Sequence, residues 1–336
     1  MKHSMILSDT RYQEQMDHLV IPYLTQRMET FCLEREPEKK LYGVRYLADS
    51  PAGIILISHG FTETTEKYRE MAYYFVNAGY HTYIIDHCGH GRSYRLVKDP
   101  SLVHIDRYER YVQDLLYTAE YAKKAHPDLS VNLYGHSMGG GIAAAAAAAA
   151  YNPQDFHRVI LSSPMIRPST GSVPWAAAGL IASVCCRIGK SEAYVFGQRP
   201  YQGKEAFEDS ASQSEARFSY YNDIKAQEPL FHMSAASFGW LHEAMRLNHF
   251  LQTKAWKQIH SPVLLFQAEQ DAFVSEKEQQ RFIARLNRQN KPVLIGTDTV
   301  PFAQCIRMPD TKHEIFSSDT DILDDYWDII IHFLSY

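Results

Sequence analysis

The pentapeptide Gly135-His136-Ser137-Met138-Gly139 carries the clearest chemical pattern in the sequence. Glycines two positions before and two positions after a serine are typical of a sharp turn between a strand and a helix, which exposes the serine hydroxyl. The residues that flank such a turn must be small, and Gly135 and Gly139 meet this requirement. The pattern predicts that Ser137 is a nucleophile that forms an acyl-serine intermediate.

A serine hydroxyl is a weak nucleophile until a neighbouring base takes its proton. In folds built on this turn, the partners follow in the order serine, acid, histidine. His313 lies between a predicted strand over 303–308 and a predicted helix over 319–333. Catalytic groups gather in loops at the C-terminal ends of strands. The other histidines after Ser137 fall in predicted helices, at a strand start or within 164–256, so His313 is the predicted base.

Asp271 is the predicted acid because it follows a predicted strand over 263–267. Its carboxylate would accept the second ring N–H of His313, fix the tautomer and stabilise the imidazolium. Three other acids remain alternatives: Glu269, Asp298 and Asp310.

Acyl transfer builds negative charge on a carbonyl oxygen, which backbone N–H groups can stabilise. The residue after the nucleophile, Met138, supplies one expected donor of this oxyanion hole. The second is expected in the loop after the predicted strand over 53–58, where Phe61 is our choice. His59 and Gly60 would shape that turn.

The elements that position these loops alternate along most of the chain. Strands are predicted over 29–34, 40–47, 53–58, 81–86, 131–134, 158–162, 263–267 and 303–308. Helices are predicted over 9–28 (interrupted near Pro22), 68–77, 106–125, 138–150, 276–286 and 319–333. This alternation predicts an α/β fold with a mostly parallel central sheet flanked by helices.

The segment 164–256 breaks the alternation because it contains helical and irregular sequence but no predicted buried strand. It is predicted to be a helical cap, inserted into a core domain made of 1–163 and 257–336. Its most apolar stretch, 173–184, reads either as a helix packed within the cap or as a wall of an acyl-chain pocket that also touches a membrane. The expected substrate pocket contains Trp175, Leu180, Phe238 and Trp240.

Composition narrows the remaining function classes. Lys and Arg number 34 and Asp and Glu 39, so the net charge is −5, which argues against a nucleic-acid partner. The spacing of the five cysteines matches no disulfide scaffold or zinc site. The segment His87-Cys88-Gly89-His90 lacks the carboxylate ligands expected beside it in a metal site, so no metal is expected. No G-x-G-x-x-G opens a helix, and no cofactor is expected.

The expected location is the cytoplasm, with a peripheral contact with a membrane surface left open. Residues 1–12 are polar and lack the apolar stretch of a secretory signal. No apolar run reaches the roughly 20 residues needed to span a bilayer. The sequence contains nothing that predicts the oligomeric state.

Taken together, these segments resemble the α/β-hydrolase family of lysophospholipases and monoacylglycerol lipases. The matching segments are His59-Gly60-Phe61, residues 86–93, Gly135-His136-Ser137-Met138-Gly139-Gly140 and His313-Glu314, with further similarity over 107–115 and 238–244. Two departures stand out. The family usually has arginine where this chain has His87 or Cys88, and 296–301 looks like extra sequence that would shift the His313 loop.

The resemblance implies hydrolysis of a carboxylic ester in a small lipid or ester substrate, such as a lysophospholipid or monoacylglycerol. The same three catalytic side chains would also serve an acyltransferase, a thioesterase or a general carboxylesterase. The sequence leaves open whether water or another acceptor receives the acyl group.

Overall fold

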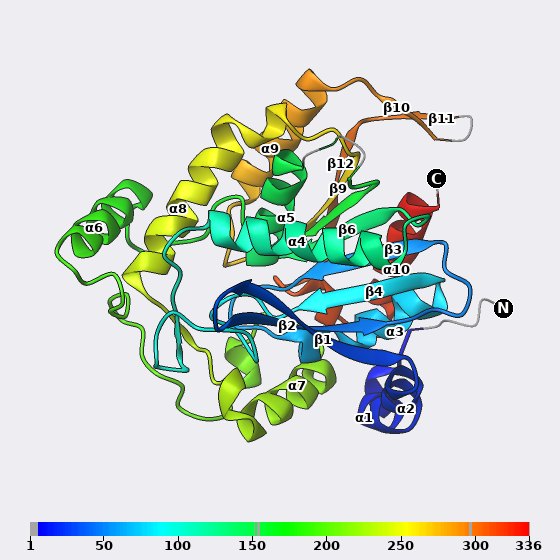
Figure 1. Cartoon of the computed structure of the whole chain (residues 1–336), viewed down its shortest axis with the longest axis horizontal. Helices are drawn as coiled ribbons and strands as arrows, with labels where there is room; N and C mark the ends of the chain where they lie inside the picture. The colour runs from blue at the N-terminus through cyan, green and yellow to red at the C-terminus, as the bar shows by residue number, and fades with distance from the viewer. Residues whose placement is uncertain (1–5, 151, 153–154, 296–297, 336) are drawn as a thin grey trace.

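The computed structural model describes residues 6–150, 152, 155–295 and 298–335. Within this part of the chain, eight strands form one central sheet in the order β1-β2-β4-β3-β6-β7-β9-β12 (Figure 1). They are β1 (Met28–Glu36), β2 (Lys39–Tyr46), β3 (Gly53–Ser58), β4 (Tyr80–Ile85), β6 (Val131–His136), β7 (Val159–Ser162), β9 (Val263–Ala268) and β12 (Ala303–Met308). The pairs β1–β2 and β2–β4 are antiparallel, and all others are parallel.

The strands at the centre of the sheet are continuous buried runs. Every residue of β3, β4, β6 and β9 is buried, as expected for parallel strands covered on both faces. The predicted bounds of β3 and β12 agree with the structure, because both runs end abruptly in turn or loop residues. The predicted α/β fold with a mostly parallel sheet is confirmed.

Helices cover both faces of the sheet. One face packs against α4 (Glu109–Ala125), α5 (Met138–Ala149) and α9 (Glu276–Gln289), and the other against α3 (Arg69–Asn77) and α10 (Thr320–Leu334). A 3₁₀ turn, η3 (Thr65–Tyr68), precedes α3, and another, η7 (Ile315–Ser317), precedes α10. Two buried apolar clusters therefore hold the sheet, one on each side.

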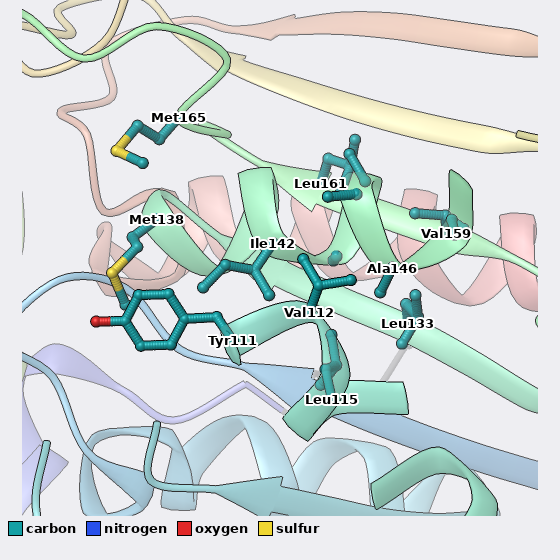
Figure 2. Packing of buried hydrophobic residues seen from close by; sticks show 14 of the residues in the cluster. Tyr111, Val112, Leu115, Leu133, Met138, Ile142, Ala146, Val159, Leu161 and Met165 are labelled. Carbon is teal, nitrogen blue, oxygen red and sulfur yellow. The ribbon is translucent and has the colours of Figure 1, made fainter. Parts of the chain in front are cut away.

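Helix α5 follows Ser137 and lies in the first of these clusters. Figure 2 shows Ile142 and Ala146 of α5 in the same buried cluster as Val112 of α4 and Leu133 of β6. Small alanine side chains let this helix pack closely among its neighbours. Its alanines from 143 to 148 are all buried.

The N-terminal helical segment differs from its prediction near Pro22. It consists of η1 (Asp9–Arg11), α1 (Tyr12–Gln15), a π-helical turn η2 (Met16–Val20) and α2 (Ile21–Thr25). Proline has no N–H and its ring crowds the carbonyl four residues earlier, and a π turn relieves both problems. The helix therefore continues through the proline and ends at Thr25, earlier than predicted, shortly before β1.

Between β7 and β9 the chain forms α6 (Trp175–Arg187), α7 (Glu215–Gln227) and α8 (Phe238–Thr253), with 3₁₀ turns η4 (Phe207–Asp209), η5 (Pro229–Phe231) and η6 (Ala255–Lys257). Helices α6 and α8 pack together at one end of the molecule (Figure 1). The expectation of no buried strand here is wrong. Strand β8 (Ala235–Ala236) is buried and pairs with β5 (Leu102–Val103), but two residues are too short to show a strand period.

The residues around the expected extra sequence form a hairpin of β10 (Val293–Ile295) and β11 (Asp298–Val300). Residues 296 and 297 of that segment lie outside the described part of the chain. Strand β12 still begins at Ala303, as predicted. No helix in the described ranges has both the length and the apolar character needed to cross a membrane.

Candidate active site

Ser137 lies in a strained turn between β6 and α5. Its backbone has φ 51° and ψ −118°, a conformation that is unfavourable for a residue with a side chain. Two hydrogen bonds join the turn to residues 162–165: Ser137 N–H donates to the Ser162 carbonyl at 3.0 Å, and Met165 N–H donates to the Ser137 carbonyl at 2.7 Å. The strain is thus maintained by the sheet and by the chain that leaves β7.

The two elbow glycines are required by close packing. A Cβ atom at Gly135 would lie 2.6 Å from the Gly139 carbonyl oxygen. At Gly139, a Cβ atom would overlap the carbonyl oxygens of Ser58 and His59, at the end of β3. Backbone atoms in a sheet cannot move away as a flexible side chain can, so neither position accepts a larger residue.

The substitution Gly139→Ala should lower the free energy of unfolding by about 1–3 kcal/mol or more, because overpacking forces the backbone to shift. Ester hydrolysis should fall with it, since the shift occurs beside Ser137. Urea unfolding and initial rates measure the two effects. Gly179→Ala is the control, because it adds a methyl group within α6 opposite the flexible side chain of Met245. Equal urea midpoints for Gly139→Ala and wild type would contradict the prediction.

The structure brings Ser137, His313 and Asp271 together. His313 Nε2 lies 2.8 Å from Ser137 Oγ, and His313 Nδ1 lies 2.7 Å from Asp271 Oδ2. The three residues follow β6, β12 and β9 respectively, at the C-terminal ends of parallel strands. In this arrangement Nδ1–H donates to Asp271, so Nε2 is free to accept the proton of Ser137.

The surroundings of Asp271 keep its carboxylate ionised. Burial alone would raise its pKa, but His313 and the N–H groups of Phe273 and Val274 lower the pKa below its usual value. Asp271 Oδ1 accepts these two N–H groups at 2.8 and 3.1 Å. Both carboxylate oxygens are therefore engaged, one with the backbone and one with the histidine.

Of the alternative acids, Glu269 has other partners. Glu269 Oε2 accepts the N–H of Asp310 at 3.0 Å, and Glu269 Oε1 lies 3.8 Å from Arg307. Asp310 lies in the turn after β12 with φ 52°. The side chain of Asp298 is outside those that the structure describes.

Backbone donors lie on both sides of the Ser137 turn. Among the described hydrogen bonds, neither Met138 N–H nor Phe61 N–H has an acceptor, which suits donors kept for a substrate oxygen. Both ring nitrogens of His59, two residues before Phe61, have partners: Nδ1 lies 2.7 Å from the Gly60 carbonyl oxygen, and Nε2 accepts His87 N–H at 2.9 Å. Burial lowers the pKa of His59 to about 4, so this ring stays neutral.

Of the four expected pocket residues, the structure brings Trp240 to the site. Its ring lies 4.4 Å from that of Phe61, measured between centroids. Phe238 packs in a small cluster between α6 and α8. Trp175 is half-buried under Arg167, and Leu180 is 67% exposed on the outer face of α6. These three residues do not meet around Ser137.

A cavity of about 240 Å³ lies between α7 and the core. Phe61 and Phe273 line the side of the cavity nearest Ser137 and His313, and Phe218 and Tyr221 line its α7 side. Phe273 also packs on His313, with ring centroids 5.0 Å apart. Sequence reasoning missed Phe273, although an aromatic residue two positions after the predicted acid was an available signal.

A second, narrow apolar space lies directly behind Met138. Its lining includes Tyr111, Met165, Leu247 and Trp240. Figure 2 shows Tyr111 and Met165 on either side of Met138.

The buried histidines near the site are used for packing. His87, one of the two residues where the family is expected to have arginine, has its Nε2 2.8 Å from Ser58 Oγ. His59 packs against both His87 and His90, with centroids 4.6 and 5.0 Å apart. Among the described side chains, no group of three or more His, Cys, Asp or Glu residues could hold a metal ion.

A mostly parallel sheet with helices on both faces, and a serine, a histidine and a carboxylate at its strand ends, defines an α/β hydrolase. The family profile described as "Serine aminopeptidase, S33" matches residues 49–295. The chain belongs to this hydrolase family and is an enzyme of the hydrolase class.

Named relatives agree with the resemblance predicted from the motifs. The chain is 25% identical to a probable lysophospholipase L2 of Haemophilus influenzae over 287 residues, which cover 84% of this chain and 83% of the relative. It is 34% identical to a monoacylglycerol lipase of Mycolicibacterium smegmatis over 138 residues, covering 39% and 47%. The fold matches a soluble variant of Saccharomyces cerevisiae monoglyceride lipase with TM-score 0.70 and 18% identity, covering 92% of this chain and 95% of that one.

Proposed function

We propose that this chain is a serine carboxylic-ester hydrolase that acts on a small lipid, a lysophospholipid or a monoacylglycerol. The observation that carries the proposal is the pair of contacts of His313, with Ser137 Oγ at 2.8 Å and Asp271 Oδ2 at 2.7 Å. The names of the relatives, lysophospholipase L2 and monoacylglycerol lipase, support an ester of a lipid as the substrate.

The geometry supports a two-step reaction. His313 Nε2 takes the Ser137 proton while Oγ attacks the ester carbonyl carbon, and the resulting oxyanion accepts N–H bonds from Phe61 and Met138. The tetrahedral intermediate then expels the alcohol, which receives the proton from His313. Water attacks the acyl-serine in the second step, again with His313 as the base, and the fatty acid leaves. Asp271 stabilises the imidazolium in both steps.

We infer also that residues 164–256 form a cap over a core of 1–163 and 257–336. Trp240 of α8 contacts Phe61, and the N–H groups of Gln213 and Ser214 donate to the Ser317 carbonyl at 3.1 and 2.9 Å. Arg217 of α7 also contacts Glu70 Oε1 at 2.8 Å and Asp9 Oδ1 at 2.5 Å. These contacts support a cap whose α7 side is tied to the core.

A labelling and rate experiment tests the proposed function. A fluorophosphonate probe should label the folded wild-type protein at Ser137, located by mass spectrometry of peptides. Rates across lysophospholipids, monoacylglycerols and short p-nitrophenyl esters should then be highest for one of the lipids. Failure of the folded protein to react with the probe would rule out the activated serine, and product formation on added alcohol or thiol would indicate an acyltransferase instead.

The rate of ester hydrolysis should fall as the pH is lowered from about 8 to 5, because a protonated imidazole cannot act as a base. Burial alone would raise the pKa of Asp271, but its contact with His313 lowers it, so this carboxylate stays ionised throughout the interval. The decline therefore needs no contribution from Asp271. Initial rates with p-nitrophenyl butyrate measure it, and a flat profile would contradict His313 as the base.

We further propose that the outer face of α6 touches a lipid surface. Leu180, Val184 and Ile188 stand four residues apart and are exposed, and Phe196 beyond them is 76% exposed. Such a stripe on a helix suits shallow insertion at a membrane interface.

The double substitution Leu180→Ser and Ile188→Ser should weaken binding to phosphatidylethanolamine–phosphatidylglycerol vesicles by about tenfold or more, because a fully buried Leu side chain contributes about 1.5–3 kcal/mol. Co-sedimentation with vesicles measures it. Leu294→Ser is the matched control, since Leu294 is equally exposed but lies in the β10–β11 hairpin, at the other end of the molecule in Figure 1. Equal binding by wild type and the double variant would overturn the proposal.

A further inference from the structure

Three charged side chains lie together beside the proposed catalytic loops and line the cavity between α7 and the core: Glu63, Lys67 and Glu314. Lys67 Nζ is 3.1 Å from Glu63 Oε1 and 2.5 Å from Glu314 Oε1. Their side chains are only 5–13% exposed. We call these three residues the Lys67 cluster. The sequence motifs include Glu314, as the neighbour of His313, but not Glu63 or Lys67.

The mutual contacts keep all three groups charged. Burial alone would lower the pKa of Lys67, but Glu314 and Glu63 raise it above its ordinary value. Burial alone would raise the pKa of both carboxyl groups, but Lys67 holds that of Glu63 well below its usual range and lowers that of Glu314. The cluster therefore acts as a set of fixed charges with directed hydrogen bonds.

Glu63 ties the cluster to the oxyanion loop and to the serine turn. Its Oε2 accepts Gly60 N–H at 2.6 Å and the Tyr68 hydroxyl at 2.6 Å. Gly60 immediately precedes Phe61, so this bond orients the chain that presents the expected oxyanion donor. Glu63 Oε1 also lies 3.3 Å from Nδ1 of His136, the residue before Ser137.

Glu314 ties the cluster to the histidine loop and to the proposed cap. It directly follows His313, and its Oε2 accepts the Ser212 hydroxyl at 2.6 Å. Its backbone N–H donates to the Ala211 carbonyl at 3.0 Å. His136 connects the serine turn to the histidine loop, since its Nε2 lies 3.4 Å from the His313 carbonyl oxygen.

We propose that Glu63, Lys67 and Glu314 are positioning residues that hold the oxyanion loop, the serine turn and the histidine loop in their productive arrangement. The inference rests on the proposed function and adds three residues to its machinery. A buried ion pair contributes little net stability compared with apolar residues of the same size. A displacement of about 1 Å at reacting groups, however, costs roughly 100-fold in rate. The cluster should therefore affect kcat more than it affects stability or KM.

The test compares Glu63→Gln and Lys67→Met with wild type on p-nitrophenyl butyrate. Both variants should lower kcat by about 100-fold, the cost of a small misplacement at the reacting groups. KM should stay within about threefold, as for an interaction realised in the transition state. Asp114→Asn is the matched control. Asp114 is equally buried and pairs with Arg35 at 2.7 Å, but it lies on α4, outside the catalytic loops. Its kcat should stay within about threefold of wild type.

Lys67→Arg separates charge positioning from simple packing. It restores a cation between the two carboxylates, so kcat should recover by about tenfold or more relative to Lys67→Met. Thermal melting checks that each variant is folded, and Glu314→Gln replaces any variant that is not. If kcat of the folded variants falls no more than that of Asp114→Asn, or if KM alone changes, the positioning role is wrong while the proposed function stands. If the wild-type protein is neither labelled at Ser137 nor active on esters, both are overturned.

Discussion

Replacing Ser137 with alanine should lower kcat for p-nitrophenyl butyrate by about 10⁵–10⁶-fold, as expected when the nucleophile of a serine hydrolase is removed. The residual rate would come from the oxyanion donors and from binding, which the substitution leaves in place. The strained turn should persist, because its bonds are made by the backbone of Ser137 with Ser162 and Met165. The free energy of unfolding should therefore change by less than about 1 kcal/mol.

Ser261→Ala is the control for Ser137→Ala. Ser261 is also buried, and its hydroxyl donates to the Phe156 carbonyl at 2.6 Å. It lies just before the N-terminal end of β9, whereas the catalytic loops follow the C-terminal ends of the strands. Ser261→Ala should keep its activity and its fluorophosphonate label. Hydrolysis by Ser137→Ala at a rate near that of wild type, or a label on another serine of that variant, would refute the nucleophile assignment.

The second large effect is expected for Asp271→Asn, which should lower kcat by about 10⁴-fold. The asparagine carbonyl oxygen can replace Oδ1 as the acceptor for Phe273 and Val274 N–H, so the loop should keep its shape. The amide NH₂ then faces His313 Nδ1, which must become an acceptor. The ring proton moves to Nε2, and Nε2 can no longer accept the proton of Ser137.

Glu269→Gln tests the rival acid in the same loop. Glu269 faces Asp310 N–H and Arg307, and its loss should change kcat by less than about threefold. Steady-state kinetics of both variants, with melting temperatures as the check on folding, decide between the two acids. A large loss in Glu269→Gln together with an active Asp271→Asn would reverse the assignment.

The centre of the sheet could be predicted because its strands β3, β4, β6 and β9 are buried on both faces. Gly53–Ser58 is a short, β-branched apolar run that ends in turn residues, and local sequence decides both features. The two-residue strand Ala235–Ala236 could not be predicted. Its only reason to be extended is its pairing with Leu102–Val103, far away in the chain.

The Lys67 cluster shows the same limit at the site. Glu63 and Lys67 are four residues apart, which by itself reads as an ordinary surface pair on a helix. Glu314 joins them from 247 residues away, and only the packing of η3 against the His313 loop brings the three charges together. The predicted pocket residues show the limit too. Trp240 reaches Phe61, whereas Leu180, on an equally apolar stretch, faces outward.

The sequence by itself determined the serine turn and the strand ends that carry the histidine and the acid. These features depend on local sequence. Glycines permit the tight turn at Ser137, and the apolar runs end where the loops at the C-terminal ends of the parallel strands begin. The tertiary structure decided that Lys67 joins the site, and that Trp240 reaches Phe61 whereas Leu180 faces outward. Those outcomes depend on the directions of side chains from distant elements, which local pattern does not encode.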